Sequence, residues 1–485
     1  MTLFSTKHFL SALIVAAIMQ TISHASTPSK NMSSPNILLI VVDDLGWNDV
    51  GFNQTTEIFE TPNIDKLAAT GLRFEQAYAG AANCAPSRAV LMSGQYGPRH
   101  GVYTVSPSAR GNPKTRKLIP IENARGLGDS IITLGESLKR AGYETGIFGK
   151  WHLGQDPDTQ GFDVNIAGSH QGMTLHYFSP YDLPNIEDGP DGEYLTERLT
   201  DEAIEWMTKA EAPFFAYIPY YTVHSPYQAY SSRVDKYHEK GVADIKQATY
   251  AAMVELMDAN VGRLLGALEK NNLDNETIVI FTSDNGGYRM SEFPSSIRGG
   301  KGSYYEGGIR VPLLIRWPGK IEAGTKATPV INADFYPTLL SLANAPFPQQ
   351  ELDGVDLTPI LLGEKNTLYR DLFWHFPVYL QAHNAPSDQG QDPLFRTRPG
   401  SAIRSGEWKL IQYFENSDFE LYNLNNDLGE RTNLAKAYPE KLNELKSKLL
   451  NWQKRTNADI PTRQNPEYDE EVNSRLIRNI QSVPH

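Results

Sequence analysis

The chain has 485 residues, of which 40% are hydrophobic and 21% are charged, and it contains one cysteine. This length suits a large α/β domain with a smaller appendage, and the composition excludes a disordered, collagen-like or coiled-coil protein. One cysteine excludes an intramolecular disulfide. The formal net charge of −12 and the lack of a Lys/Arg-rich block predict no nucleic-acid partner. Basic groups for any anionic substrate must then be concentrated in a pocket.

Residues 1–25 match the pattern of a cleaved secretory signal peptide. Lys7 precedes an apolar run over residues 9–19, and Ser23 and Ala25 supply the small side chains of a cleavage site. The alternative is a buried or membrane-anchoring helix, but the run is too short to cross a bilayer comfortably. No later stretch approaches about 18 apolar residues. We therefore expect an exported protein, periplasmic or secreted, with no membrane attachment after signal cleavage.

Strands that alternate with helices predict an α/β fold. Continuous apolar runs predict buried strands over residues 36–42, 143–148, 213–220 and 277–282. Amphipathic patterns bounded by Pro, Gly or polar residues predict helices over residues 62–71, 130–142, 195–210 and 243–273. The expected fold is a large mixed, mostly parallel sheet sandwiched by helices.

The sequence becomes aromatic and loop-rich near residue 365. Residues 401–422 predict short strands of an antiparallel sheet, and residues 439–456 predict a helix that packs on them. The polar residues 457–485 are expected to wrap the surface. The predicted parts of the chain are a signal peptide at 1–25, a larger N-terminal domain at 26–364, and a smaller C-terminal α+β domain with its tail at 365–485.

Two pairs of oxygen-bearing side chains follow two of the expected strands. Asp43 and Asp44 follow the first strand, and Asp284 and Asn285 follow the strand that ends at residue 282. Ligands of open α/β sheets lie at the carboxyl ends of strands. Three carboxylates and one amide oxygen suit a hard divalent cation such as Ca²⁺ or Mg²⁺. Either pair alone could simply form a turn, but two pairs at equivalent strand ends favour a metal site.

The single cysteine, Cys84, lies at the expected N-terminus of a helix. Pro86 suits the first helical turn, and residues 89–94 continue as a helix-like run. The helix dipole favours an anion at this end, and Arg88 lies one turn later on the same face. The alternatives are a small buried hydrophobic side chain and a thiol nucleophile paired with a histidine.

The run Cys84-Ala85-Pro86-Ser87-Arg88, followed by residues 89–94, resembles the signature of the type I sulfatases. These enzymes are formylglycine-dependent members of the alkaline phosphatase-like superfamily. Further segments resemble this family in the same order, namely residues 36–47, 149–154, 161–163, 224–227, 282–287 and 300–312. One short motif would be weak evidence, but an ordered series is specific. The resemblance covers residues 36–360 and implies a sulfatase-type C-terminal domain after them.

The resemblance implies a sulfatase that acts through a modified cysteine and a metal ion. A formylglycine-generating or other sulfatase-maturing enzyme would oxidise Cys84 to 3-oxoalanine (formylglycine). A hydroxyl of its gem-diol would attack sulfur and form a covalent sulfo-enzyme intermediate. One Ca²⁺ ion, with Mg²⁺ less favoured, would lower the pKa of that hydroxyl. The ligands implied by the resemblance are Asp43, Asp44, Cys84, Asp284 and Asn285.

The resemblance also assigns roles to five further side chains. Arg88 would hold the formylglycine, and Lys150 and Lys301 would neutralise the sulfate oxygens. His224 is the expected acid for the leaving group, with Lys301 as a second choice, and His152 would contact the formylglycine and help to release sulfate. Each histidine or lysine alone could be structural, so their joint occurrence is what favours these roles.

Exported bacterial members of this family mostly act on sulfated glycans, which implies a sulfated poly- or oligosaccharide partner. We expect a carrageenan- or ulvan-type algal polysaccharide first and a glycosaminoglycan second. The substrate-binding residues that we expect from their type are His100, His170, His176, His375, His383 and Arg404. Aromatic residues considered with them are Tyr103, Tyr177, Trp374 and Tyr379. Basic residues available for additional sulfates are Arg99, Arg298, Arg396 and Arg398.

Two other functions remain open from the sequence. A phosphatase or phosphonate monoester hydrolase of the same superfamily would normally carry more metal ligands and a Ser or Thr nucleophile. A glycan-binding pseudo-sulfatase would be expected to lack at least one of the catalytic residues, which are all present here. A third, weaker reading is a hydrolase that uses Cys84 as a thiol nucleophile, and the mass of the peptide that contains Cys84 would distinguish it.

Overall fold

The computed structural model describes residues 34–53, 57–105, 107–288, 295–381 and 393–482. The predicted signal peptide therefore lies outside the described residues. None of the described helices combines the length and the apolar character that a membrane crossing requires. Residues 34–485 form one compact unit.

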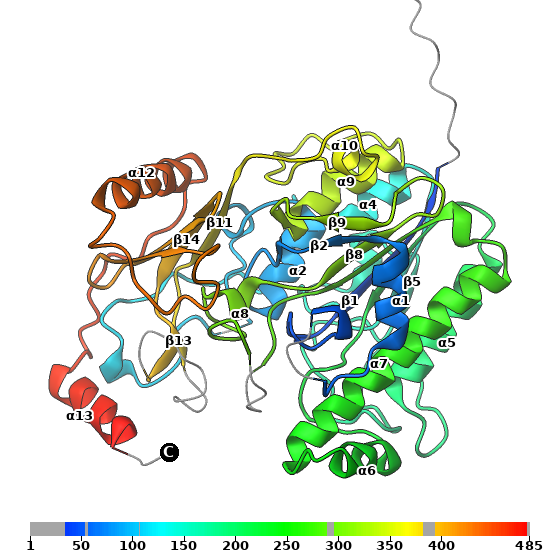
Figure 1. Cartoon of the computed structure of the whole chain (residues 1–485), viewed down its shortest axis with the longest axis horizontal. Coiled ribbons are helices and arrows are strands. Elements are labelled where there is room, and N and C mark those ends of the chain that lie inside the picture. The colour runs from blue at the N-terminus through cyan, green and yellow to red at the C-terminus, as the bar shows by residue number, and fades with distance from the viewer. Residues whose placement is uncertain (1–33, 54–56, 106, 289–294, 382–392, 483–485) are drawn as a thin grey trace, which may run out of the picture. The chain divides into compact units, whose positions relative to one another are not determined.

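An eight-stranded mixed sheet forms the centre of this unit (Figure 1). Its order is β5-β4-β6-β1-β7-β8-β2-β9, and most neighbours are parallel, while β8 is antiparallel to both β7 and β2. The strands are β1 (Asn36–Val42), β2 (Leu72–Phe74), β4 (Glu144–Phe148), β5 (Val164–Ile166), β6 (Phe214–Pro219), β7 (Thr277–Ser283), β8 (Leu313–Arg316) and β9 (Gly324–Lys326). The predicted mixed, mostly parallel sheet is confirmed.

Helices cover both faces of this sheet, which explains why its central strands are continuously apolar. Alternate residues of β1 enter two different hydrophobic cores: Leu38 and Ile40 lie in one core, and Leu39 and Val41 lie in the other. The first core is covered by α1 (Pro62–Thr70), α5 (Leu195–Lys209), α6 (Ser231–Glu239) and α7 (Ile245–Lys270). The second is covered by α2 (Cys84–Ser93), α4 (Leu134–Arg140), α9 (Phe335–Leu342) and α10 (Thr358–Leu361).

A four-stranded antiparallel sheet follows in the C-terminal part of the chain, as predicted. Its order is β11 (Asp371–Phe376), β14 (Gly400–Ser405), β15 (Trp408–Tyr413) and β16 (Asp418–Asn423). Helix α12 (Pro439–Arg455) packs on β14 and β15. Tyr78 and Tyr305 share a core with Leu410 of this sheet. The two sheets thus belong to one compact unit, and the boundary at residue 365 stays a prediction.

The remaining elements are short, apart from the C-terminal helix α13 (Glu470–Gln481). Two-stranded pairings join β3 (Ala77–Tyr78) to β10 (Val330–Ile331) and β12 (Leu380–Gln381) to β13 (Phe395–Thr397). The other helices are α3 (Gly97–His100), α8 (Glu306–Ile309) and α13 (Glu470–Gln481). The 3₁₀ turns are η1 (Gly51–Asn53), η2 (Pro113–Thr115), η3 (Pro157–Gln160), η4 (Asp274–Glu276) and η5 (Asn332–Asp334).

Two predicted segments differ from the structure. The helix expected over residues 130–142 begins at Leu134, because Thr133 and Glu136 form a capping box that fixes its start. The C-terminal stretch contains the helix α13, which the sequence analysis did not predict although Val472, Leu476 and Ile480 recur at the spacing of one helix face. Asp469 caps this helix by accepting hydrogen bonds from two backbone amides of its first turn.

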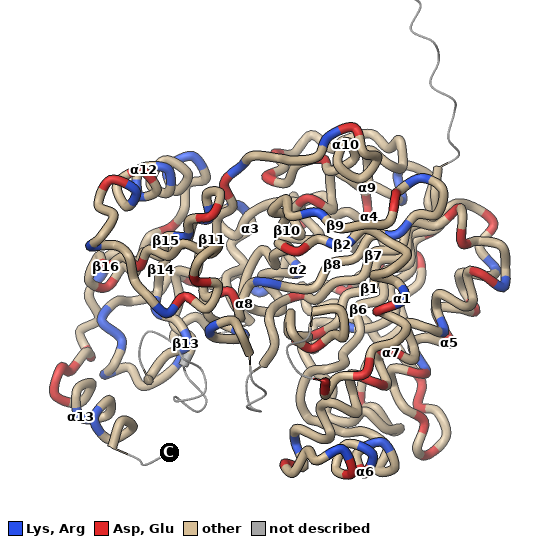
Figure 2. Tube along the Cα trace, viewed as in Figure 1, with Lys and Arg blue, Asp and Glu red and all other residues tan. Residues whose placement is uncertain are grey.

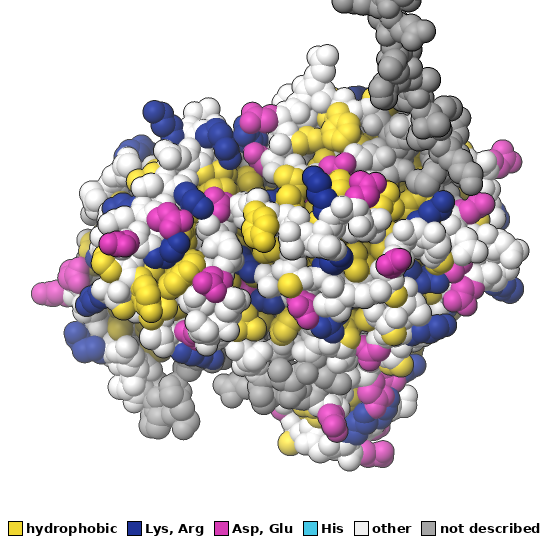
Figure 3. All heavy atoms as spheres, turned by 45° about the horizontal axis from the view of Figure 1, so that its top comes forward, with side chains coloured by type: hydrophobic (Ala, Val, Ile, Leu, Met, Phe, Trp, Pro, Cys, Tyr) yellow, Lys and Arg dark blue, Asp and Glu magenta, His cyan; other side chains and the backbone are white. Residues whose placement is uncertain are grey.

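The charged side chains of both signs are mixed along the outer elements. Figure 2 shows acidic and basic residues on the same helices, including α5, α6, α12 and α13. On the face drawn in Figure 3, acidic and basic side chains are likewise interspersed. A local excess of positive charge must therefore be sought in a pocket.

Candidate active site

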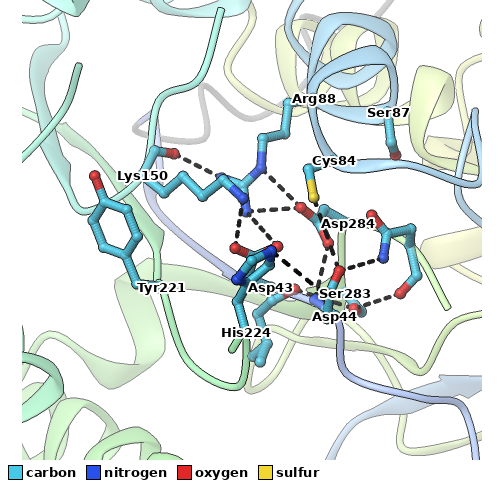
Figure 4. Close-up of polar contacts among 12 residues, drawn as sticks. Asp43, Asp44, Cys84, Ser87, Arg88, Lys150, Tyr221, His224, Ser283 and Asp284 are labelled. Atoms are coloured by element: carbon cyan, nitrogen blue, oxygen red, sulfur yellow. Dashed lines mark hydrogen bonds and ion pairs between the residues drawn. The ribbon is translucent and has the colours of Figure 1, made fainter. Parts of the chain in front are cut away.

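The site forms where β1 and β7 end beside each other. These strands are parallel, and their register pairs Val42 with Ser283. Asp43 and Asp44 therefore leave the sheet next to Asp284 and Asn285, as the sequence analysis expected. One carboxylate oxygen from each of the three aspartates lies within 4.8 Å of the other two (Figure 4).

A strained turn holds the carboxylates together. Asp44 has a φ of 63°, which is the left-handed region that non-glycine residues rarely adopt. Its backbone amide donates a hydrogen bond of 3.2 Å to Oδ1 of Asp284, and the amide of Leu45 donates to Oγ of Ser283 at 3.1 Å. Strained backbone of this kind is retained where the surroundings determine it, often at functional sites.

Cys84 begins helix α2 and is buried beside these carboxylates. The side chain of Asn83 caps the helix and accepts a hydrogen bond of 3.2 Å from the amide of Cys84. Gly94 ends the helix in the left-handed conformation. The sulfur of Cys84 lies 3.8 Å from Oδ1 of Asp44. The helix N-terminus thus presents residue 84 to the acidic cluster.

Each of the three carboxylates contacts one cationic side chain. Lys150 Nζ lies 2.6 Å from Asp43 Oδ2, and Lys301 Nζ lies 2.7 Å from Asp44 Oδ1. Arg88 Nε donates to Asp284 Oδ2 at 2.8 Å.

Arg88 also joins two parts of the site, since its Nη1 donates to the backbone carbonyl of Lys150 at 2.6 Å. Arg88 and Lys150 are fully buried. The predicted contact of Arg88 with a formylglycine stays a prediction.

Two buried oxygen atoms suit a metal ion. Among the described residues, Asp43 Oδ1 and Asn285 Oδ1 have no hydrogen-bond donor, although both are inaccessible to solvent. A buried acceptor without a hydrogen bond is costly, so such atoms favour a bound ion or water beside them. Asn285 Nδ2 donates to Asp44 Oδ1 at 2.8 Å, which turns the amide oxygen of Asn285 away from Asp44. Carboxylate and amide oxygens are the ligands that a hard divalent cation prefers.

His224 and His152 lie beside Cys84 at the same site. His224 Nε2 lies 3.7 Å from Asp44 Oδ2, and its Nδ1 lies 2.6 Å from the carbonyl of Ser225. His152 has a φ of 64°, and its Nδ1 has no hydrogen-bond partner among the described residues. A Cβ at Gly172 would lie 2.4 Å from the ring of His152, so only glycine allows the chain to approach this ring so closely.

Burial and neighbouring charges shift the pKa values of these groups. Burial raises the pKa of the Cys84 thiol to about 12, and the nearby Asp43 adds to this shift. Burial and Asp43 also raise the pKa of Asp284 to about 6. The pKa of His224 falls to about 3 through burial and the positive charge of Lys301. The Asp44 carboxylate raises the pKa of Lys301 against the opposing effect of burial, so this lysine remains charged.

These residues open into a pocket of about 390 Å³. Five of the predicted site residues line it: Asp44, Cys84, His152, His224 and Lys301. The other lining residues are Asn83, Val105, Arg110, Gly172, Met173, Ser225, Tyr288, Leu380 and Arg396. The sequence analysis named Arg396 only as an available cation, and it missed Arg110, Met173 and Tyr288.

Arg110, Met173 and Tyr288 lie in irregular segments with no periodicity or motif. The only signal in the sequence was the positive charge of Arg110, and many surface arginines carry the same charge.

None of the described predicted substrate-binding residues lines this pocket, and three of them are buried elsewhere. His100 is buried and its Nδ1 accepts a hydrogen bond from the amide of Val102. His375 is buried between Ser401 Oγ at 2.7 Å and the carbonyl of Asp459 at 3.1 Å. Arg404 is buried and donates to the hydroxyl of Tyr78 at 2.7 Å. We therefore leave these three out of the proposed substrate surface, because packing and internal hydrogen bonds occupy them.

The other residues considered for substrate fall into two groups. His170 is exposed with its ring centroid 6.1 Å from that of His152. His176 is also exposed, whereas His383 lies outside the described residues. Tyr103, Tyr177, Trp374 and Tyr379 are buried. Arg99 pairs with Asp353, Arg398 pairs with Glu415, and Arg298 stacks on Tyr305.

The fold and the site together define a hydrolase of the alkaline phosphatase-like superfamily. The family model described as Sulfatase matches residues 35–345, and one described as N-sulphoglucosamine sulphohydrolase, C-terminal, matches residues 300–455. A sulfatase of Formosa agariphila is 34% identical and covers 93% of this chain and 95% of its own. Human arylsulfatase A is 35% identical, with 86% and 87% covered.

The solved structures agree with this assignment. The crystal structure of Ps i-CgsB is 30% identical, with a TM-score of 0.71, and covers 92% of this chain and 98% of its own. A second structure of that protein contains k-i-k-neocarrahexaose and gives a TM-score of 0.70. The chain therefore belongs to the type I sulfatase family and is a hydrolase of sulfate esters.

Proposed function

We propose that this sulfatase removes sulfate from a sulfated carbohydrate, and that the carbohydrate is a carrageenan-type algal galactan or an oligosaccharide from it. Support for the substrate comes from Ps i-CgsB, which was solved with k-i-k-neocarrahexaose. An ulvan-type polysaccharide is the next substrate to test, followed by a glycosaminoglycan. The reaction itself rests on one observation: the only cysteine of the chain begins a buried helix and lines the pocket beside the aspartate cluster.

The proposed nucleophile derives from Cys84. Burial raises the pKa of its thiol to about 12, so an unmodified Cys84 stays protonated at neutral pH and is a poor nucleophile. Oxidation to formylglycine by a maturing enzyme would supply a hydrated aldehyde whose hydroxyl attacks sulfur. The Asn83 cap and the following helix would hold residue 84 at the mouth of the acidic cluster during the reaction.

The proposed metal ligands are Asp43, Asp44, Asp284 and Asn285, together with the modified residue 84. They offer oxygen atoms, and one carboxylate oxygen of each aspartate lies within 4.8 Å of the other two, which supports a cation between the strand ends. A set of this many protein oxygens suits Ca²⁺ better than Mg²⁺, which usually keeps several waters. The ion, when bound, lowers the pKa of a hydroxyl and polarises a sulfate oxygen.

The cationic side chains would bind and orient the sulfate. Lys301 lines the pocket, and Lys150 lies behind Asp43, so both bring positive charge toward the sulfate oxygens. Arg88 keeps Asp284 and the backbone of Lys150 in place. These contacts are made before substrate arrives, which reduces the reorganisation needed during the reaction.

His224 is the proposed acid for the leaving group. Its pKa of about 3 reflects burial and the charge of Lys301, and a bound sulfate ester opposes that charge and raises the pKa. His152 is proposed to accept a proton from residue 84 when sulfate leaves. Its pKa is lowered well below the ordinary value by burial and by Lys150, so it is neutral and able to accept a proton.

We further propose that the protein is exported, to the periplasm or to the medium, by the segment at residues 1–25. A charged residue followed by an apolar run supports this proposal. N-terminal sequencing of the protein from both fractions would test it, and a chain that begins at Met1 in the cytoplasm would contradict it.

Sulfate release from a panel of glycans tests the proposed reaction and substrate. The chain is coexpressed with a formylglycine-generating enzyme, and carrageenans, ulvan, chondroitin sulfate and heparin are supplied as polymers and oligosaccharides. Cys84→Ala is the blank, and phenyl phosphonate tests the rival activity. We expect Cys84-dependent release from carrageenan oligosaccharides. Release from ulvan or a glycosaminoglycan alone would overturn the proposed substrate, and phosphonate hydrolysis without any sulfate release would overturn the proposed carbohydrate reaction.

A further inference from the structure

Two arginines line the catalytic pocket without a role in the reaction described above. Arg110 lies in the loop before η2, and Arg396 lies on β13, so they approach the pocket from segments far apart in the sequence. Both line the same pocket as Cys84. Arg110 is half-buried and Arg396 is buried. These two positions bring charged groups close to the reacting residue.

The carboxylates of the centre already contact other cations. Lys150, Lys301 and Arg88 lie within 2.8 Å of Asp43, Asp44 and Asp284, respectively. Arg110 and Arg396 are two further cationic side chains in the lining of this pocket. A chain with a net charge of −12 has concentrated this charge at one place.

Burial makes this added charge unfavourable in the empty pocket. It lowers the pKa of Arg110, and it lowers the pKa of Arg396 to about 10, with the charge of Arg110 acting in the same direction. Two like charges in a half-enclosed cavity favour the entry of an anion. The scissile sulfate carries only one negative charge, and Lys301 already faces it.

Arg396 is held in an orientation that suits an oxyanion. Its guanidinium lies 4.9 Å from the centre of the Tyr288 ring, and its Nη1 donates to the carbonyl of Lys301 at 3.2 Å. The side chain is thus fixed directly beside the catalytic lysine. A planar guanidinium recognises sulfate or carboxylate oxygens in a paired geometry, and a stacked arginine loses less freedom on binding.

We propose that Arg110 and Arg396 bind a second oxyanion of the substrate, next to the scissile sulfate. The sulfatase would then select sulfate esters that carry another sulfate or a carboxylate on the same or the adjoining sugar. This inference rests on the proposed function, because it names a charge pattern within that substrate class. The shared chemistry is a second oxyanion, and the experiment separates its two sources.

Kinetics on matched substrates tests the proposal. The mature enzyme is compared with Arg110→Gln and Arg396→Gln on four esters: 4-nitrophenyl sulfate, a monosulfated disaccharide, a disulfated disaccharide and a monosulfated disaccharide with a uronate. We expect each variant to lower kcat/KM on one of the doubly charged esters about ten-fold more than on the singly charged ones. Arg140→Gln, which removes an exposed arginine of α4, is the matched control and should keep the wild-type ratio.

The four substrates also identify the second group. A larger loss on the disulfated ester indicates a sulfate, and a larger loss on the uronate ester indicates a carboxylate. An equal loss on all four esters would overturn the proposal, because the arginines would then serve the scissile sulfate. An unchanged ratio in both variants would also overturn it.

Binding without turnover keeps this test separate from the proposed reaction. In the Cys84→Ala background, calorimetry measures the Kd of the disulfated, uronate and monosulfated disaccharides with and without Arg110→Gln. We expect tighter binding of a doubly charged ligand than of the monosulfated one, and we expect Arg110→Gln to remove most of that preference. Equal affinities for all three ligands would overturn the subsite even if sulfate release is confirmed. Thermal unfolding of each variant shows whether it is folded. If Arg396→Gln does not fold, Arg110→Gln alone still tests the proposal.

Discussion

Two buried clusters of carboxylates and cations lie in this molecule, and they differ in one respect. The catalytic cluster contains Asp43, Asp44 and Asp284 with Arg88, Lys150 and Lys301. The C-terminal cluster contains Glu306 and Glu430 with Arg310 and Lys409, and it ties α8 to the antiparallel sheet. Both clusters are almost fully buried.

In the C-terminal cluster, each carboxylate oxygen contacts a donor or a cation. Lys409 Nζ lies 3.0 Å from Glu306 Oε1 and 2.8 Å from Glu430 Oε1. Glu306 Oε2 accepts from Tyr78 and Arg310, and Glu430 Oε2 accepts from the amide of Glu306 at 2.6 Å. Each carboxylate oxygen of this cluster thus has a donor or a cation within 3.0 Å, although Glu430 Oε1 has only the ion pair with Lys409 and no hydrogen bond from the described residues. We therefore interpret this cluster as one that stabilises the fold.

The catalytic cluster has oxygen atoms that accept no hydrogen bond from the part of the chain that the structure describes. Asp43 Oδ1 and Asn285 Oδ1 lack a hydrogen-bond donor among the described residues, and the cation beside Asp43 Oδ1, Arg88 Nη2, lies 3.9 Å away. A pocket of about 390 Å³ adjoins the cluster. The comparison teaches that buried charge alone does not mark a site. A buried cluster marks a site when some of its polar atoms lack hydrogen-bond partners beside a cavity, because a bound ligand can supply those partners.

The largest expected effect comes from removing the nucleophile. Cys84→Ala should lower kcat for sulfate release at least about 1000-fold, since no other group in the pocket can replace a covalent nucleophile. The variant should still unfold cooperatively, because a small side chain replaces another of similar size. Stopped-time sulfate assays and thermal unfolding check both points, and a variant that retains a tenth of the activity would contradict the assignment.

The second effect is the loss of stability when the C-terminal cluster loses its lysine. Lys409→Met leaves the carboxylates of Glu306 and Glu430 facing each other in the interior, which should cost about 3–5 kcal/mol of unfolding free energy. Adding Glu430→Gln removes one of these charges and should restore part of the loss. Denaturant titration measures the unfolding free energy of each variant. If Lys409→Met unfolds at the wild-type denaturant concentration, the cluster does not stabilise the fold.

The third effect is a pH dependence of stability on the C-terminal side. Burial lowers the pKa of His375 to about 4 from 6.5. The unfolded chain then binds a proton that the folded chain does not, so stability is lost as pH falls from about 6.5 to 4, by about 3 kcal/mol. His375→Gln should flatten this part of the profile. An unchanged slope in that variant would contradict the assignment of a buried neutral histidine.

The smallest effect tests whether the catalytic cluster binds a metal ion. After chelation, Ca²⁺ at 100 times its Kd should raise the unfolding free energy of the wild type by about 2.7 kcal/mol. Asp284→Asn should lose most of this response, because a ligand charge is removed. Glu430→Gln should keep it, because that carboxylate belongs to the C-terminal cluster. Thermal unfolding with and without Ca²⁺ provides the measurement, and an equal response in Asp284→Asn would exclude this ligand.

Much of the catalytic cluster could be predicted because local sequence carries it. The apolar runs of β1 and β7 are long enough to identify, and parallel strands bring their carboxyl ends to one edge. The sequence alone therefore predicts that Asp43 and Asp284 lie close together. Cys84 follows the same logic, since helix-start signals surround it.

The substrate side could not be predicted in this way. His100 and His375 were chosen for their residue type, but their neighbours in space, which the sequence does not list, hold them in the interior. Arg110 and Tyr288 reach the pocket from irregular loops whose path depends on tertiary packing. The helix α13 was missed although Val472, Leu476 and Ile480 recur at the four-residue spacing of one helix face, a signal that the sequence does carry.

The most direct test of the account relates activity to conversion of Cys84. Batches coexpressed with different amounts of the formylglycine-generating enzyme are digested with trypsin, and the peptide of residues 74–88 is weighed. Formylglycine makes it lighter by about 18 Da, whereas a thiol nucleophile would leave its mass unchanged. Sulfate release per mole should rise in proportion to the converted fraction and vanish at zero conversion. Full activity in unconverted enzyme would contradict the central claim.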